Sequence, residues 1–76
     1  MRKVTVEIDR EDRCIFFTIS NGPGPITRGM VELGENGRHI VTYQLHRTTR
    51  RPNTKPYSQY DWPQEIDEAV LELEGI

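Results

Sequence analysis

The sequence predicts a small α+β domain, in which an antiparallel β-meander of about four strands packs against one C-terminal α-helix. Three observations predict this class: apolar and polar residues alternate in the first half of the chain, Gly- and Pro-rich turns separate the alternating stretches, and apolar residues recur at helical spacing near the C-terminus. With 76 residues, the chain has room for one domain, residues 1–76, and for a modest core.

Two strands are predicted within the first twenty residues. Val4, Val6 and Ile8 alternate with polar residues, which indicates a strand over about 3–9 with one buried face. The stretch 14–20 is rich in β-branched and aromatic residues, which are favoured in strands, and it is apolar enough for a central position in the sheet.

A β-hairpin is predicted for residues 26–33 and 39–46. A three-residue turn with Gly37 in the left-handed region gives a consistent apolar face. The alternative is a two-residue Asn-Gly turn, which would place Glu32 opposite Val41 and mix charged with apolar side chains. The pairs expected from the three-residue turn are Val31 with Val41, Leu33 with His39, Thr27 with Leu45, and Gly29 with Tyr43.

The last element is a predicted helix over about 62–74. Its apolar residues follow the i, i+3, i+4, i+7 pattern of a helix with one buried face: Ile66, Ala69, Val70 and Leu73. Asp61 is the expected N-cap, Pro63 falls in the first turn, and Gly75 is the expected stop.

Charge is divided unevenly along the chain. Residues 36–60 contain five Lys or Arg and no Asp or Glu, whereas residues 61–76 contain six Asp or Glu and no Lys or Arg. A pI of about 5.6 argues against generic coating of nucleic acid, which is typical of domains with a pI above about 9. Glu72 and Glu74 oppose the helix dipole at a cost of roughly a few tenths of a kcal/mol each if exposed, which favours a compensating role such as docking on a basic partner, or else a contact with the protein's own basic residues 47–60.

Residues 47–60, called the basic arm below, are the leading candidate for a binding site. They show neither helical nor strand periodicity, and their two prolines argue against a strand. Loops of this length are uncommon in compact domains and tend to be functional or disordered. Since Arg, Tyr and Trp dominate interface hot spots, the predicted binding residues are Arg47, Arg50, Arg51, Lys55, Tyr57, Tyr60 and Trp62.

These features predict a nonenzymatic binding module, a small regulator, adaptor or inhibitor that docks on a larger protein through the basic arm and the neighbouring hairpin. The alternative is a nucleic-acid-binding protein, in which the same cations contact phosphates and Tyr57 or Tyr60 stacks on unpaired bases. In a third interpretation the arm is a solvated linker whose arginines pair with Glu65 or Glu68 of the helix.

Residues that could support catalysis or metal binding are few. Cys14 is the only cysteine, which excludes an intramolecular disulfide and a Cys-based zinc site and favours a cytoplasmic location. His39 and His46 fall on opposite faces of the predicted strand, with His39 at the margin of the core, so they do not converge. We therefore expect no enzymatic activity, metal or cofactor.

No apolar stretch approaches the length of a membrane span, so no membrane association is expected. A small core would gain from self-association, so a homodimer is a further expectation.

Overall fold

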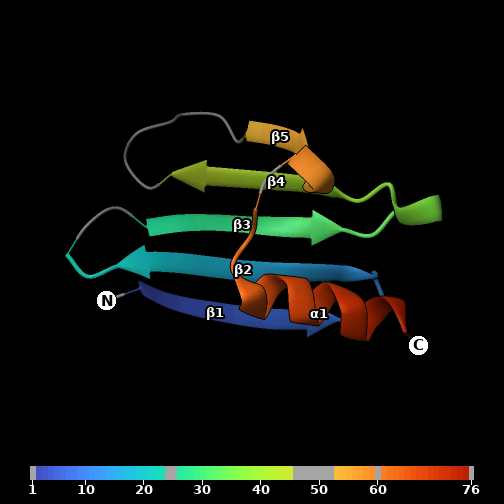
Figure 1. The fold of residues 1–76 in the computed structure, drawn as a ribbon, viewed down its shortest axis with the longest axis horizontal. Coiled ribbons are helices and arrows are strands. Elements are labelled where there is room, and N and C mark those ends of the chain that lie inside the picture. The colour runs from blue at the N-terminus through green and yellow to red at the C-terminus, as the bar shows by residue number, and fades with distance from the viewer. Residues whose placement is uncertain (1, 24–25, 46–52, 60, 76) are drawn as a thin grey trace.

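Five β-strands form one antiparallel sheet, and one α-helix lies across part of one of its faces (Figure 1). This computed structural model describes residues 2–23, 26–45, 53–59 and 61–75. The α+β architecture with one C-terminal helix is confirmed. Its elements are β1 (Arg2–Asp9), β2 (Cys14–Asn21), β3 (Ile26–Glu32), the 3-10 helix η1 (Glu35–Gly37), β4 (Ile40–Leu45), β5 (Asn53–Pro56), the 3-10 helix η2 (Tyr57–Gln59) and α1 (Gln64–Glu74).

The fifth strand corrects the prediction for the basic arm. β5 lies within residues expected to be irregular, and it pairs with β4 at the edge of the sheet. A strand of four residues is too short to show a period of two, and its one proline, Pro56, occupies the last position of an edge strand, where a missing N–H is tolerated. The next residue, Tyr57, donates its backbone N–H to the carbonyl of His39 at 2.9 Å.

The strands follow one another in chain order, and the predicted hairpin register is confirmed. Val31 pairs with Val41, Gly29 with Tyr43, and Thr27 with Leu45, while the expected pair of Leu33 with His39 lies just beyond the last paired residues, Glu32 and Ile40. The turn has the register of the three-residue form. However, both Asn36 and Gly37 have positive φ, 58° and 74°, as the central residues of Asn-Gly turns do.

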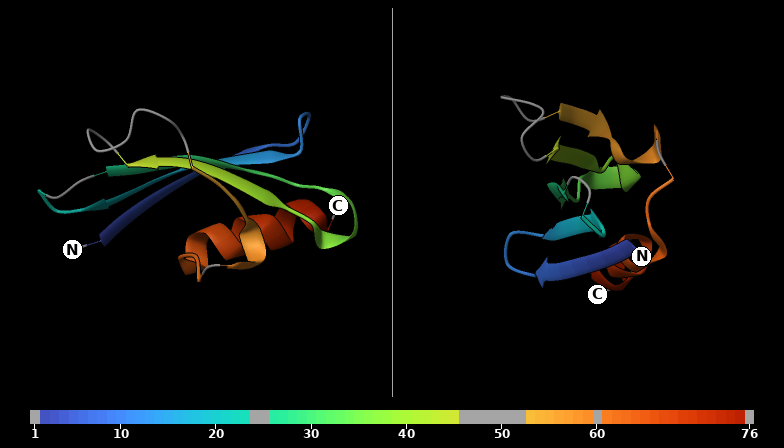
Figure 2. Two further views of the ribbon diagram at one scale, coloured as in Figure 1. Left: turned by 90° about the horizontal axis from the view of Figure 1, so that it is seen from above. Right: turned by 90° about the vertical axis from the view of Figure 1, so that its left-hand side faces the viewer.

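α1 lies on one side of the sheet, as the edge-on view in Figure 2 shows, and apolar side chains from the sheet pack against it there. The fully buried side chains are Ile15, Val31, Val41 and Ile66, and the helix adds Ala69, Val70 and Leu73, which confirms the predicted helical stripe. Gly29 belongs to this face, where a Cβ would lie 2.5 Å from the Phe17 ring and 2.8 Å from the Thr42 carbonyl oxygen. A glycine is therefore needed for Phe17 to pack against β3.

The predicted start of the helix is wrong by two residues, and Asp61 is not its N-cap. α1 begins at Gln64 after Pro63, whose φ and ψ of -52° and 147° are not helical and whose carbonyl accepts the first helical hydrogen bonds. A proline disfavours the helical conformation in the residue before it, so Trp62 stays outside the helix. Gly75 ends the helix as predicted. No helix in the described part of the chain has the length and apolar character needed to cross a membrane.

Candidate functional site

Four aromatic rings gather where the chain passes from β5 to α1, and we call them the aromatic cluster: Phe17, Tyr43, Tyr57 and Trp62. Trp62 is the common member. Its ring centroid lies 5.7 Å from that of Phe17, 6.0 Å from that of Tyr43 and 6.1 Å from that of Tyr57. The indole N–H donates a hydrogen bond of 2.9 Å to the backbone carbonyl of Tyr57. These contacts hold the segment before the helix against the sheet.

Tyr57 connects this cluster to the helix. Its ring stacks on Trp62 at an interplanar angle of 14°, and its hydroxyl donates a hydrogen bond to the carboxylate of Asp67 in α1. The pKa of the Tyr57 phenol is raised, mainly by burial. The hydrogen bond to Asp67 and the negative charge of that residue raise it further. Folding therefore favours the protonated phenol.

This pKa shift predicts a loss of stability in alkaline solution. The unfolded chain ionises Tyr57 near pH 10, whereas the folded chain keeps its proton to higher pH. The contribution of Tyr57 is therefore fully present below about pH 10 and is lost as the pH rises above that value. In urea denaturation between about pH 9 and about pH 11, the midpoint of the wild type should fall more steeply than that of Tyr57→Phe. Equal slopes would contradict the prediction.

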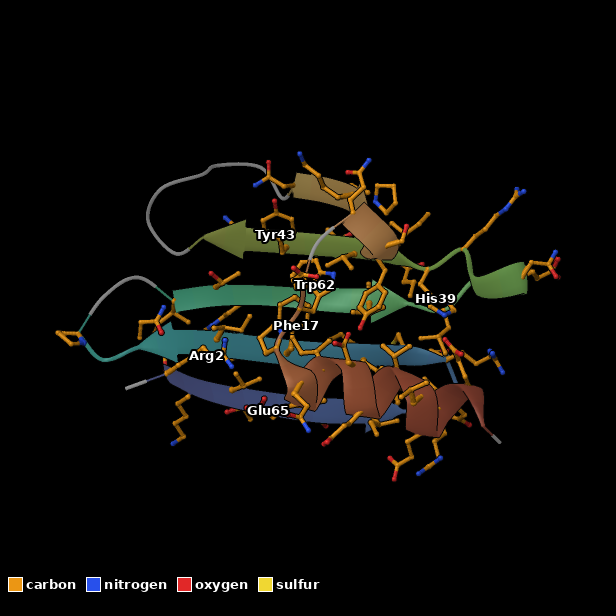
Figure 3. The ribbon with its side chains drawn as sticks, viewed as in Figure 1. Arg2, Phe17, His39, Tyr43, Trp62 and Glu65 are labelled. Atoms are coloured by element: carbon orange, nitrogen blue, oxygen red, sulfur yellow. The ribbon has the colours of Figure 1, made fainter. Side chains whose placement is uncertain are left out.

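A pocket of about 340 Å³ opens beside the aromatic cluster, at the end of the sheet where β1 begins and β4 ends. We call it the Trp62 pocket. It combines two aromatic rings and an apolar floor with a guanidinium, a carboxylate, an amide and a hydroxyl group, supplied by Arg2, Ile19, Asn21, Thr27, Tyr43, Asp61, Trp62 and Pro63. Figure 3 shows Arg2, Tyr43 and Trp62 on the side of the sheet that carries α1. The volume is at the lower end of that typical of ligand pockets.

Three of the seven predicted binding residues are described by the structure. Trp62 lines the pocket, and the ring of Tyr57 stacks on that of Trp62. Lys55 is half-buried in β5, where it pairs with Val41. Their role in partner binding stays a prediction. The other four lie outside the described residues: Arg47, Arg50, Arg51 and Tyr60.

The ends of the undescribed part of the arm are fixed at the Trp62 pocket. The chain leaves β4 after Leu45, which pairs with Thr27, and it enters β5 at Asn53, which pairs with Tyr43. Thr27 and Tyr43 both line the pocket. The segment with three of the predicted arginines therefore begins and ends at strand positions next to this pocket.

The sequence did not single out Arg2 and Tyr43 as binding residues. The predicted hairpin register already placed Tyr43 opposite Gly29, on the apolar face that the helix was expected to cover. Arg2 enters the pocket only through the pairing of β1 with β2, which sets it opposite Asn21, and local patterns do not fix that pairing.

A second hollow of about 390 Å³ lies between β1 and α1. Its floor is apolar, and three helix carboxylates form its rim; it is lined by Val4, Val6, Ile8, Ala69, Glu65, Glu68 and Glu72. Glu72 pairs with Arg10 at 3.7 Å, and the amide of Gln64 donates to Glu68 at 2.8 Å. The proposed pairing of these carboxylates with the arm arginines lies outside the described residues.

His39 is buried at the margin of the core, with 7% of its surface exposed. Its Nδ1 accepts the backbone N–H of Gly34 at 3.1 Å, and its Nε2 lies 2.5 Å from Oε1 of Glu74. Since Nδ1 is an acceptor, the ring proton is on Nε2, which donates to Glu74. This contact and the ion pair of Glu72 with Arg10 offset the unfavourable position of these carboxylates at the negative end of the helix, through residues outside the basic arm.

Cys14 is buried and free. Burial raises the pKa of its thiol, and the negative charges of Asp9, Asp12 and Glu32 raise it further. The reactive thiolate is therefore disfavoured. Among the described residues, no three His, Cys, Asp or Glu side chains form a group that could hold a metal ion.

No protein-family model matches the chain, and comparisons with curated proteins and with solved structures find no match either. The residues of the site are therefore the basis for inferring the function. The Trp62 pocket offers aromatic, apolar and charged groups for noncovalent contact, which suits recognition of another molecule.

Proposed function

We propose that the protein is a nonenzymatic binding module that docks on a larger protein through the basic arm and the Trp62 pocket. The observation that carries the proposal is the position of this pocket, because both fixed ends of the undescribed arm segment lie against residues that line it. The arm and the pocket would then form one continuous surface.

The chemistry of the pocket favours a protein partner. Trp, Tyr and Arg are the residues most enriched at interface hot spots, and Trp62, Tyr43 and Arg2 all line the pocket. An apolar or aromatic side chain of the partner would fill the space between the two rings, and the arginines of the arm would contact polar groups around it. A cytoplasmic location belongs to the same proposal, since the one cysteine, Cys14, is unpaired.

The test combines an arm variant, a pocket variant and a matched control. Tagged wild type, Arg50→Glu/Arg51→Glu, Arg2→Glu and Arg38→Glu are used to recover binding proteins, which are identified and then titrated in purified form. Arg38 is exposed and follows η1, in the turn between β3 and β4, so its substitution makes the same charge change as Arg2→Glu away from the pocket. Thermal melts of all variants should stay close to that of the wild type.

We expect the arm variant to abolish recovery of the partner, Arg2→Glu to weaken the purified complex at least about tenfold, and Arg38→Glu to bind like the wild type. Undiminished recovery with the arm variant would defeat the proposal. Fluorescence anisotropy with labelled single-stranded DNA, duplex DNA and RNA tests the alternative. Tight binding that falls log-linearly with salt concentration would replace the protein partner with a nucleic acid.

A further inference from the structure

The sheet face that points away from α1 is partly apolar. For the described residues, Figure 2 shows α1 on the opposite face, and the aromatic cluster belongs to the core that α1 covers. Strand alternation places Phe16, Arg28, Met30, Glu32, Ile40 and Thr42 on the side away from them, which we call the open face. Phe16 and Ile40 are 44% and 48% exposed, and together with Leu71 of the helix they are the large exposed hydrophobic residues of the described chain.

The residues at the apolar centre of the open face are direct neighbours on adjacent strands. Phe16 pairs with Met30, and Met30 pairs with Thr42, so these three side chains form one row across three central strands. A shallow hollow of about 250 Å³ follows this row, and most of its exposed lining is apolar. Side chains of this kind in the middle of a sheet face are typical of an interaction surface.

Charges of opposite sign flank this row along the direction of β3. Arg28 precedes Met30 by two residues on β3, and Glu32 follows it by two, so both point to the open face. On β1, Lys3 lies towards the basic end and Asp9 towards the acidic end, where it pairs with Cys14. The open face is therefore apolar in the middle of β2, β3 and β4, basic at one end of the strands and acidic at the other, and its central row ends at exposed Glu7 on the edge strand β1.

We propose that the open faces of two copies of this chain pack on each other around a two-fold axis that runs across the strands. Such an axis reverses the strand direction, so Arg28 of each copy lies over Glu32 of the other, with Phe16 and Met30 at the centre. A two-fold axis along the strands would place basic ends over basic ends, where like charges repel each other. The charges of Arg28 and Glu32 on β3 are thus self-complementary in this arrangement, as an isologous interface requires, and Glu7 meets its own copy only at the β1 edge of the interface.

The size of the open face is sufficient for a dimer. Five strands spaced at about 4.8 Å and seven residues at about 3.4 Å each give a face of roughly 24 by 24 Å. Two such faces in contact would bury about 1,100 Å² in total, which clears the minimum of about 1,000 Å² for a biological interface and is typical of a weak one. Aligned packing of two twisted sheets leaves the strands within about 30° of each other, which this axis allows.

The test is a charge exchange at two exposed positions, measured by sedimentation equilibrium from about 1 to about 300 µM protein, a range that covers interfaces of this size. The variants are Arg28→Glu, Glu32→Arg and the double variant Arg28→Glu/Glu32→Arg. Arg38→Glu and Glu65→Arg make the same charge changes at exposed positions away from the open face.

We expect the wild type to dimerise and each single variant to raise the dimer dissociation constant at least about tenfold, because each places like charges together twice in the symmetric interface. The double variant should return to within about threefold of the wild type, and both controls should match the wild type. A monomeric wild type would overturn the proposal. So would single variants that dimerise normally, or a double variant that stays dissociated. Because these substitutions spare the arm and the Trp62 pocket, the result is independent of the proposed function.

Discussion

Replacing Trp62 with alanine is expected to unfold much of the protein near room temperature. Truncation of a packed Trp or Phe costs about 3 to 5 kcal/mol, and a chain of this size has a net stability of roughly 3 to 5 kcal/mol. Trp62 contacts Phe17, Tyr43 and Tyr57, and its indole N–H satisfies the carbonyl of Tyr57. Its removal therefore separates α1 from the sheet on which it packs.

Urea denaturation followed by far-UV circular dichroism measures this effect. Leu71→Ala is the matched control, since Leu71 is an apolar residue 67% exposed on α1, and its truncation should change stability by less than about 0.5 kcal/mol. Trp62→Phe keeps an aromatic ring but not the N–H donor, so its midpoint should fall between those of the wild type and Trp62→Ala. A midpoint for Trp62→Ala equal to that of Leu71→Ala would show that the cluster does not hold the helix.

Substitution of Arg2 separates binding from folding, whereas substitution of Trp62 does not. Trp62 contacts the core and lines the pocket, so its loss would weaken folding and binding together. Arg2 is an exposed residue at the start of β1, and its side chain can be changed with little effect on packing.

Much of the fold was predictable because its signals are local. Alternation in 3–9 and the helical spacing of Ile66, Ala69, Val70 and Leu73 each depend on residues a few positions apart. The hairpin register was also predictable, because only one turn length kept charged residues off the apolar face.

The remaining features depend on contacts between distant residues. β5 is recognisable as a strand only through its pairing with β4. The delayed start of α1 reflects Pro63 and the packing of Trp62 on Phe17, forty-five positions earlier in the chain. The Trp62 pocket likewise requires Arg2 and Trp62 to meet across the domain, which no local period encodes. The candidate site was therefore predictable as a region of the chain but not as a pocket.

Glu72 and Glu74, at the C-terminal end of α1, combine a local signal in the sequence with contacts to distant residues. Their position against the helix dipole was visible in the sequence and favoured a compensating role or a contact with the basic arm, whereas the contacts with His39 and Arg10 were not predicted. In the structure, Glu74 accepts a hydrogen bond from buried His39, whereas Glu72 forms an exposed pair with Arg10. Only the first of these contacts joins two elements of the core, since it fixes the end of α1 to the segment between β3 and β4.

His39→Ala is therefore expected to cost about 2 to 3 kcal/mol, because it leaves the Gly34 N–H without its acceptor and Glu74 without its donor. Glu74→Gln should cost less, about 1 kcal/mol, since its side chain is 41% exposed and can turn to water. The combined variant should be no less stable than His39→Ala, because the two changes remove one shared contact. Urea denaturation of the wild type, the two single variants and the combined variant gives the coupling energy between His39 and Glu74.

The control is Glu72→Gln, which breaks only the exposed ion pair with Arg10, 3.7 Å long. Its stability should stay within about 0.5 kcal/mol of the wild type. If the costs of His39→Ala and Glu74→Gln simply add, the contact does not hold the helix end, and the stabilising role of His39 lies in its packing and in the Gly34 hydrogen bond alone.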